Sequence, residues 1–134
     1  MAFVRFQELA VYQLSEQIAD AVWEIVLQWE MLARDTVGKQ LIRSADSIGA
    51  NIAEGSGRGS HGDNQRFVRI ARGSLHETQH WLRRAFRRKL LTAEQTRALQ
   101  AKIDEFAPAL NGYLNSIGRK VRSRGGRQEQ PTKH

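Results

Sequence analysis

Helical periodicity is clearest in the stretch TAEQTRALQAKIDEFAPALNGYLNSIG, which spans residues 92–118. Its apolar side chains recur at alternating steps of four and three, which aligns them along one helix face: Leu99, Ile103, Phe106, Leu110, Tyr113 and Ile117. Thr92 and Gln95 form a capping-box pattern at its start. Pro108 removes the hydrogen bond to the carbonyl of Asp104, so we expect a kink there. The stretch predicts a long amphipathic helix that must pack against others.

Three further helices are predicted upstream, over residues 7–32, 36–54 and 63–89. Their expected inward faces comprise, in order, Val11, Leu14, Ile18, Ala21, Ile25 and Leu32; Val37, Leu41, Ser44, Ile48 and Ile52; and Phe67, Ile70, Ala71, Ser74, Thr78, Trp81 and Ala85. Small residues at four-residue steps, Ala45, Gly49 and Ala53, predict a close helix contact. We expect Gly55 to cap the second helix in a left-handed conformation and Asp63 to be the N-cap of the third.

Short connections between the helices predict antiparallel neighbours, and therefore an all-α, up-down-up-down four-helix bundle. Residues 1–118 form this domain, and the basic, Gly-rich residues 119–134 are expected to be a disordered tail. The chain has no cysteine, no signal-peptide pattern and no apolar run of membrane-spanning length. We therefore expect a soluble, cytoplasmic protein without a membrane partner.

Charge is unevenly distributed along the chain. Residues 1–65 carry 5 basic and 9 acidic side chains, whereas residues 66–134 carry 16 and 5. This asymmetry predicts a polyanion partner for the second half. Nucleic acid is the commonest such partner, and an acidic protein or a membrane surface is the alternative.

The third predicted helix concentrates these cations on the face opposite its apolar side. Five arginines and two histidines fall within a sector of about 120° at 100° per residue: Arg66, Arg69, Arg72, His76, His80, Arg83 and Arg87. Arg84, Arg88 and Lys89 widen the sector, and Arg119, Lys120, Arg122 and Arg124 of the tail add to the predicted nucleic-acid-binding set. The helix dipole accounts for cations at the C-terminal end of this helix, but not for those near its start. The pattern favours a polyanion-binding face over a merely solvated one.

No residue pattern for catalysis or metal binding is found. His76 and His80 share a helix face and His61 precedes them, but no carboxylate or cysteine stands in register to complete a zinc site. No Glu-x-x-His pair supports di-iron chemistry, and no nucleophile–base set can be assigned. We therefore expect no enzyme activity, cofactor or metal.

The first predicted helix has more apolar side chains than its one inward face can hold. Trp23, Val26, Leu27 and Trp29 lie partly off it. Either the helix has a broad core contact or a second face packs against another subunit.

The stretch QLIRSADSIGANIAEGSGR (residues 40–58) resembles the signature of the four-helix-bundle family that includes the proteins encoded in 23S rRNA intervening sequences. The stretches FQELAVYQLSEQIA (residues 6–19) and RFVRIARGSLHETQHWL (residues 66–82) resemble the first and third helices of that family. The resemblance implies a homopentameric barrel. It also implies a relation to accessory proteins of diversity-generating retroelements, which bind a reverse transcriptase and its RNA.

Within the signature, Arg43, Asn51 and Glu54 are polar residues on a helix that otherwise packs inward. A buried carboxylate needs a partner, so we expect a structural polar network in which Arg43 or Arg72 pairs with Glu54. The function expected from the whole chain is a non-catalytic scaffold that binds nucleic acid, with RNA preferred because of the resemblance. The alternative is an adaptor that docks a protein such as a reverse transcriptase.

Overall fold

The computed structural model describes residues 5–129, with side chains up to Ser123. All regular structure in this part of the chain is helical, in the order η1 (Phe6–Glu8, a 3₁₀ turn), α1 (Ala10–Val26), α2 (Met31–Ala33), η2 (Arg34–Gly38, a π-helical turn), α3 (Lys39–Ser56), α4 (His61–Arg87) and α5 (Ala93–Glu129). No described helix is long and apolar enough to cross a membrane.

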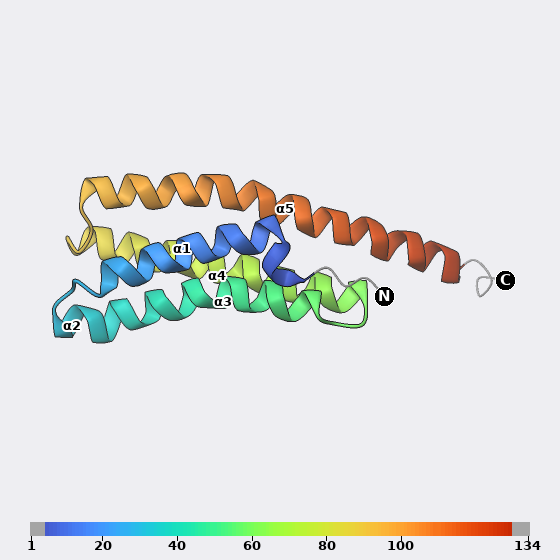
Figure 1. Ribbon diagram of the computed structural model, residues 1–134, viewed down its shortest axis with the longest axis horizontal. Coiled ribbons are helices and arrows are strands. Elements are labelled where there is room, and N and C mark those ends of the chain that lie inside the picture. Colours follow the sequence, from blue (N-terminus) through green and yellow to red (C-terminus); the bar gives the residue numbers. More distant parts are fainter. Residues whose placement is uncertain (1–4, 130–134) are drawn as a thin grey trace.

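The four long helices, α1, α3, α4 and α5, are arranged so that neighbouring helices run antiparallel (Figure 1). α1 packs against α3 and α5, and α4 packs against the same two helices, so the four close into a ring around a shared core. Successive helices reverse direction at each connection (Figure 1), which confirms the predicted up-down-up-down bundle.

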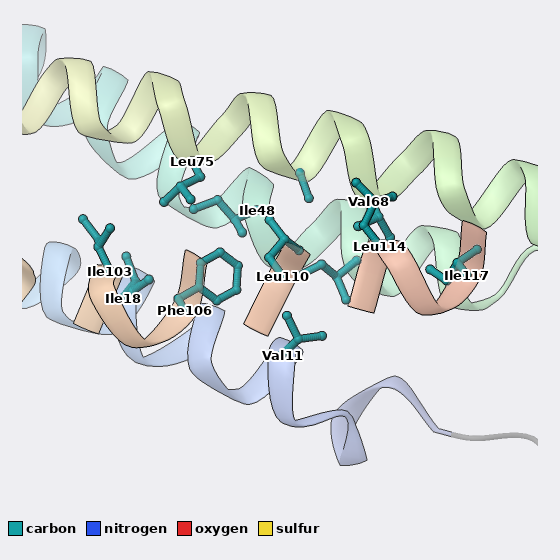
Figure 2. Close-up of a cluster of buried hydrophobic side chains, with 12 residues drawn as sticks. Val11, Ile18, Ile48, Val68, Leu75, Ile103, Phe106, Leu110, Leu114 and Ile117 are labelled. Carbon is teal, nitrogen blue, oxygen red and sulfur yellow. The ribbon is translucent and has the colours of Figure 1, made fainter. Parts of the chain in front are cut away.

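The core forms two adjoining clusters along the bundle axis. The larger one surrounds Phe106 and contains side chains from all four long helices (Figure 2). The second lies toward the α1–α2 and α4–α5 turns and includes Val22, Leu41 and Leu99. The inward face predicted for residues 37–52 is buried at every position, and so is that of residues 99–117 except for the half-buried Tyr113. Apolar burial of this extent supplies most of the bundle's stabilisation.

The buried stripe of α1 differs from the predicted one. It comprises Val11, Ser15, Ile18, Val22 and Val26, whereas Leu14, Ala21 and Ile25 are half-buried. Leu32 was predicted to continue the stripe but is 80% exposed. The reason is that α1 ends at Val26, so Leu32 belongs to the next helical segment.

The first turn of the bundle falls earlier than predicted. Hydrogen bonds from the amides of Gln28 and Trp29 to the carbonyls of Ile25 and Val26 tighten the end of α1. Glu30 is extended, and a second helical segment begins at Met31 and continues through α2 and η2 into α3. This turn contains neither glycine nor proline, so the usual signals for a helix end are missing.

Gly55 does not cap α3, which is a second correction. No described glycine has a positive φ, and α3 continues to Ser56 with Gly57 at its C-cap. Gly55 is instead buried where α3 meets α4: a Cβ at this position would lie 2.6 Å from Asn64 Oδ1 and 2.9 Å from Phe67 Cβ. Its missing side chain permits the close approach of the two helices. Gly49 confirms the predicted small-residue contact, because a Cβ there would lie 2.8 Å from Ser15 Oγ of α1.

The basic tail is not disordered where the structure describes it. α5 continues without interruption through residues 119–129 and extends beyond the other helices at one end of the bundle (Figure 1). Residues 130–134 of the predicted tail lie outside the described part of the chain.

Pro108 is accommodated inside α5, and the axis of this helix changes direction part-way along its length (Figure 1).

Candidate nucleic-acid interface

α4 presents the predicted row of cations on the side facing away from the core. Its N-cap is Ser60, whose Oγ accepts a hydrogen bond from the amide of Asp63 at 3.1 Å. Asp63 therefore lies inside the first helical turn rather than at the cap, where we had placed it. Val68, Ala71 and Leu75 are buried on the opposite side of the helix.

Most side chains of the predicted nucleic-acid-binding set are exposed. The set on α4 and its C-terminal turn is exposed at Arg66, Arg69, His76, His80, Arg83, Arg87, Arg88 and Lys89, and half-buried at Arg72 and Arg84. On α5, Arg119, Lys120 and Arg122 are exposed. Arg124 belongs to the helical part of α5, but its side chain lies outside the described residues. The cations thus form a surface open to a large ligand.

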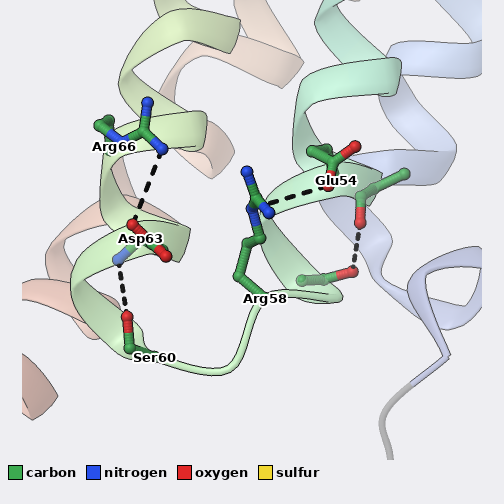
Figure 3. A network of polar contacts seen from close by, with 7 residues as sticks. Glu54, Arg58, Ser60, Asp63 and Arg66 are labelled. Carbon is green, nitrogen blue, oxygen red and sulfur yellow. Dashed lines mark hydrogen bonds and ion pairs between the residues drawn. The ribbon is translucent and has the colours of Figure 1, made fainter.

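Little of this positive charge is neutralised within the described chain. The one ion pair found there for the cations of α4 joins Arg66 to Asp63 at 3.7 Å, close to the N-terminus of the helix (Figure 3). Both partners are at least half exposed, so the pair is weak and screened by salt. Glu77 is the one acid between Asp63 and Glu94, so the positive charges along the row add up with little cancellation.

An aromatic ring sits between two arginines at the same end of the bundle. The guanidinium carbons of Arg58 and Arg66 lie 4.6 and 4.7 Å from the centroid of Phe67. Arg58 is also ion-paired with Glu54 at 3.6 Å (Figure 3). These cation–π contacts hold two cations near the α3–α4 connection.

The cations of α5 adjoin those of α4. A Cβ added to Gly118 would lie 3.2 Å from Gln65 Nε2 and 3.3 Å from Arg122 Nη1. Gln65 is next to Arg66 in α4, so the start of the α4 row and the extension of α5 meet at one end of the bundle. Val121 packs against the core, which fixes the orientation of this part of α5. The start of the α4 row thus lies next to this part of α5, and we call the α4 set together with Arg119, Lys120 and Arg122 the basic face.

Lys89 lies just after the C-terminal end of α4, where the basic face ends. Its backbone is in a left-handed conformation, with φ 62°. The amide of Leu90 bonds the carbonyl of Ala85 at 2.9 Å, and the amide of Lys89 bonds that of Phe86 at 3.0 Å. This pair of bonds is a Schellman motif, whose left-handed position is usually glycine. The turn is thus closed at the expense of a strained lysine backbone.

The predicted network of Arg43, Asn51 and Glu54 is wrong. Glu54 is exposed and pairs with Arg58, while Arg43 is exposed as well. Asn51 donates from Nδ2 to Ser47, at 2.8 Å to its carbonyl and 3.0 Å to its Oγ. The prediction is wrong because Glu54 does not point inward with the rest of the signature but faces solvent beside the α3–α4 connection.

A ladder of hydroxyls joins α3 and α4 where the buried network was expected. Thr78 Oγ1 lies 3.0 Å from Ser44 Oγ, and Ser74 Oγ lies 3.0 Å from Ser47 Oγ. Serine hydroxyls commonly bond their own helix backbone, as Ser44 Oγ does to the carbonyl of Leu41 at 3.1 Å. Their place on two facing seams was the available signal, since small polar side chains at facing positions lie within mutual reach.

Acidic side chains gather between α1 and α3, the two helices on the other side of the bundle from α4 and α5. A groove of about 170 Å³ between α1 and α3 is lined by Glu16, Asp20 and Asp46, among others. Burial raises the pKa of Asp46, and the nearby negative charge of Asp20 raises it further. Burial likewise raises the pKa of Tyr12, together with a hydrogen bond to Glu16. Positive and negative charge are therefore separated, with the cations concentrated on α4 and α5.

Within the described residues, no three histidine or acidic side chains come together in a group that could hold a metal. His76 and His80 are exposed on the basic face, and the ring of His80 packs edge-on against Trp81 at a centroid distance of 4.8 Å. His61 lies in the first turn of α4, at its N-terminus. The three histidines are thus distributed along α4.

Comparison with known proteins assigns the family. The model of the 23S rRNA-intervening sequence protein family matches residues 7–112. The chain belongs to this family. Its fold also matches the crystal structure of a protein of unknown function from the S23 ribosomal protein family of Bacteroides thetaiotaomicron, with a TM-score of 0.70 and 25% identity over 78% of this chain and 98% of the other. No curated protein gives a significant match.

The family assignment and the basic face coincide only in part. The residues matched by the family model include all of α4 but stop at residue 112, within α5. Arg119, Lys120 and Arg122 therefore lie beyond the matched region, although they adjoin the α4 row in space. The family points to an RNA-related role, and α4 is the part of the basic face that belongs to the family region.

Proposed function

We propose that this protein is a non-catalytic RNA-binding scaffold of the cytoplasm. The observation that carries the proposal is the row of exposed cations on α4, of which only Arg66 has an ion pair within the described chain. The extension of α5 adds three exposed cations to the same surface. A phosphate backbone is the polyanion whose repeated charges match such an extended row.

Binding by this face depends on phosphates more than on bases. Arginine forms bidentate hydrogen bonds with phosphate oxygens, and a rigid helix holds the guanidinium groups in place before binding. The arginine row itself therefore supplies affinity and orientation rather than sequence discrimination. RNA rather than DNA is proposed because of the family.

We further propose that the scaffold is a homo-oligomer, a pentamer as the resemblance implies. An apolar patch at the α1–α2 end supports self-association: Trp23 and Leu27 are 49% and 47% exposed, and Met31 and Leu32 are 68% and 80% exposed. A cluster of large apolar side chains on the surface marks an interaction site. Several copies of the basic face in one assembly would multiply weak phosphate contacts.

Self-association is tested with Leu27→Asp and Met31→Asp, examined by sedimentation velocity. Both side chains are exposed within one chain, so the substitutions should leave helix content unchanged and produce monomers. A wild-type protein that sediments as a monomer at micromolar concentration contradicts the oligomer.

The alternative function is an adaptor that docks an acidic protein surface, such as that of the reverse transcriptase of a diversity-generating retroelement. One observation favours it: the cations sit on ordered helices, α4 and α5, where a protein partner could meet them in fixed geometry. An adaptor predicts tight binding to that protein and weak binding to free RNA.

The experiment is titration of a fluorescent structured RNA by anisotropy at low and physiological salt, with duplex DNA of matched length alongside. The scaffold predicts tight binding to RNA that weakens steeply with salt, because bound counterions are released from the phosphates. Absence of binding to RNA even at low salt contradicts the scaffold and leaves the adaptor.

A further inference from the structure

A groove separates α4 from α5 beside the basic face. It measures about 230 Å³, and its apolar walls include Leu82 and Phe86 of α4, Leu91 of the connecting turn, and Leu99 and Ile103 of α5. Arg83 also lines it, so one wall of the groove belongs to the cation row itself. An apolar recess thus opens directly next to phosphate-binding side chains.

Phe86 is the wall residue most available to a ligand. Half of it is exposed, at 50%, and it lies in sequence between Arg83 and Arg87 of the same helix. An aromatic side chain among arginines offers a flat surface for stacking where a charged strand would run.

The rim of the groove supplies both donors and acceptors of hydrogen bonds. Gln79 and Arg83 carry N–H donors there. Gln100 donates from Nε2 to Asp104 at 2.8 Å, which leaves its Oε1 as an acceptor. Thr96 donates to the carbonyl of Thr92 at 2.9 Å and keeps its oxygen lone pairs. A mixed edge of this kind matches the mixed donors and acceptors of a nucleobase.

We propose that this groove binds an unpaired base of an RNA strand whose phosphates lie on the arginines of α4. The base stacks on Phe86 and presents its edge to Gln79 and Gln100, while Arg83 and Arg87 hold the adjoining phosphates. This inference rests on the proposed function and deepens it, since it predicts that single-stranded or looped RNA is preferred over a continuous duplex.

The size of the groove favours a base over a peptide helix. Ordinary ligand pockets measure about 300–1,000 Å³, so a recess of about 230 Å³ suits a single ring system. An amphipathic helix would need an apolar groove long enough for anchors at i, i+4 and i+7. The polar rim of Gln79, Thr96 and Gln100 would also leave hydrogen-bonding groups unpaired against such a helix.

The experiment measures the affinity of the full chain for two fluorescent RNAs, an unstructured single strand and a blunt duplex of equal charge. Phe86→Leu keeps the groove apolar but removes the stacking surface, and it should weaken single-strand binding about tenfold, the effect of losing one stacked base. Duplex binding should stay within about twofold of wild type. Arg83→Glu should weaken both, and Gln17→Ala, a change at an exposed position of α1 away from the groove, should weaken neither.

The outcomes separate this inference from the proposed function. If wild type binds both RNAs and Phe86→Leu changes neither affinity, the base site is wrong while the phosphate face stands. If the wild type binds no RNA, the proposed function itself fails. Equal loss for both RNAs, with an unchanged melting temperature, contradicts stacking of an unpaired base. An acidic helical peptide that binds wild type and not Phe86→Leu, while RNA binding is unaffected, assigns the groove to a protein and overturns the inference.

Discussion

The indole of Trp29 donates a hydrogen bond from Nε1 to the backbone carbonyl of Leu90 at 3.0 Å, across 61 positions of sequence. The bond ties the α1–α2 turn to the α4–α5 turn, at the end of the bundle where the second core cluster lies. Trp29 is half-buried, in contrast to Trp23, which is exposed. Of the two tryptophans considered for a subunit contact, Trp29 therefore serves the chain's own fold.

Replacing Trp29 by Phe should lower the free energy of unfolding by about 1 kcal/mol or slightly more, since a part-buried hydrogen bond and some packing are lost. Urea denaturation followed by circular dichroism measures the change. Trp23→Phe is the matched control and should leave the monomer's stability within about 0.5 kcal/mol of wild type. Equal effects of the two substitutions would show that the bond to Leu90 contributes nothing.

Lys89→Gly should stabilise the protein by about 1 kcal/mol, because glycine adopts the left-handed conformation of the Schellman motif without the steric cost that lysine bears there. Thermal unfolding detects this as a higher melting temperature. Lys89→Ala removes the same charge and keeps the steric cost, so it separates the backbone effect from electrostatics. A melting temperature of Lys89→Gly no higher than that of Lys89→Ala would contradict the left-handed turn.

Gly55→Ala should destabilise the bundle by about 1–3 kcal/mol, since the added methyl group would be driven against Phe67 Cβ and Asn64. Gly73→Ala is the opposite case: no atom lies within 4 Å of a Cβ at that position in α4. It should stabilise by up to about 1 kcal/mol through helix propensity. Chemical denaturation of both variants checks the pair, and the same sign for the two would refute the close α3–α4 approach at Gly55.

Asp46→Asn should raise the melting temperature at pH 7. The pKa of Asp46 is raised by its burial and by the charge of Asp20, so the folded protein binds a proton more tightly than the unfolded chain. Stability contributed by this group therefore falls as the pH rises from the ordinary value of 3.8 through the raised pKa. The difference between variant and wild type should shrink as the pH is lowered toward that value. A difference that is independent of pH would exclude this cause.

The sequence predicted most of the bundle because periodic burial is a local property. The seam of residues 99–117, the capping box of Thr92 and Gln95 and the exposed row of α4 could all be found by counting residues. Both capping-box bonds form, at 3.0 Å from the amide of Gln95 to Thr92 Oγ1 and at 2.9 Å from the amide of Thr92 to Gln95 Oε1. These features depend on residues within a turn or two of one another.

The failures concern features set by tertiary contacts. The turn after Val26 is held by Trp29 bonding Leu90, a contact 61 positions away that no local pattern signals. Gly55 is the residue type expected at a helix C-cap, but here it permits α3 and α4 to pack closely together. The extension of α5 was predicted disordered from its composition, whereas Val121 packs on the core and continues the helix. The groove beside Phe86 could not be seen at all, since its walls come from two helices.

The most direct test of the phosphate-binding face is a charge reversal with a matched control. Arg69, Arg83 and Arg87, all exposed on α4, are replaced together by Glu, and exposed arginines elsewhere, Arg34, Arg43 and Arg97, are replaced together in a second variant. Both variants change the net charge equally, and anisotropy titration of one structured RNA at physiological salt compares them. We expect binding to be abolished by the α4 variant with its helix content intact, and the control to lose only a small part of its affinity. Equal losses in the two variants would mean that net charge alone attracts RNA, and would contradict the basic face as the binding surface.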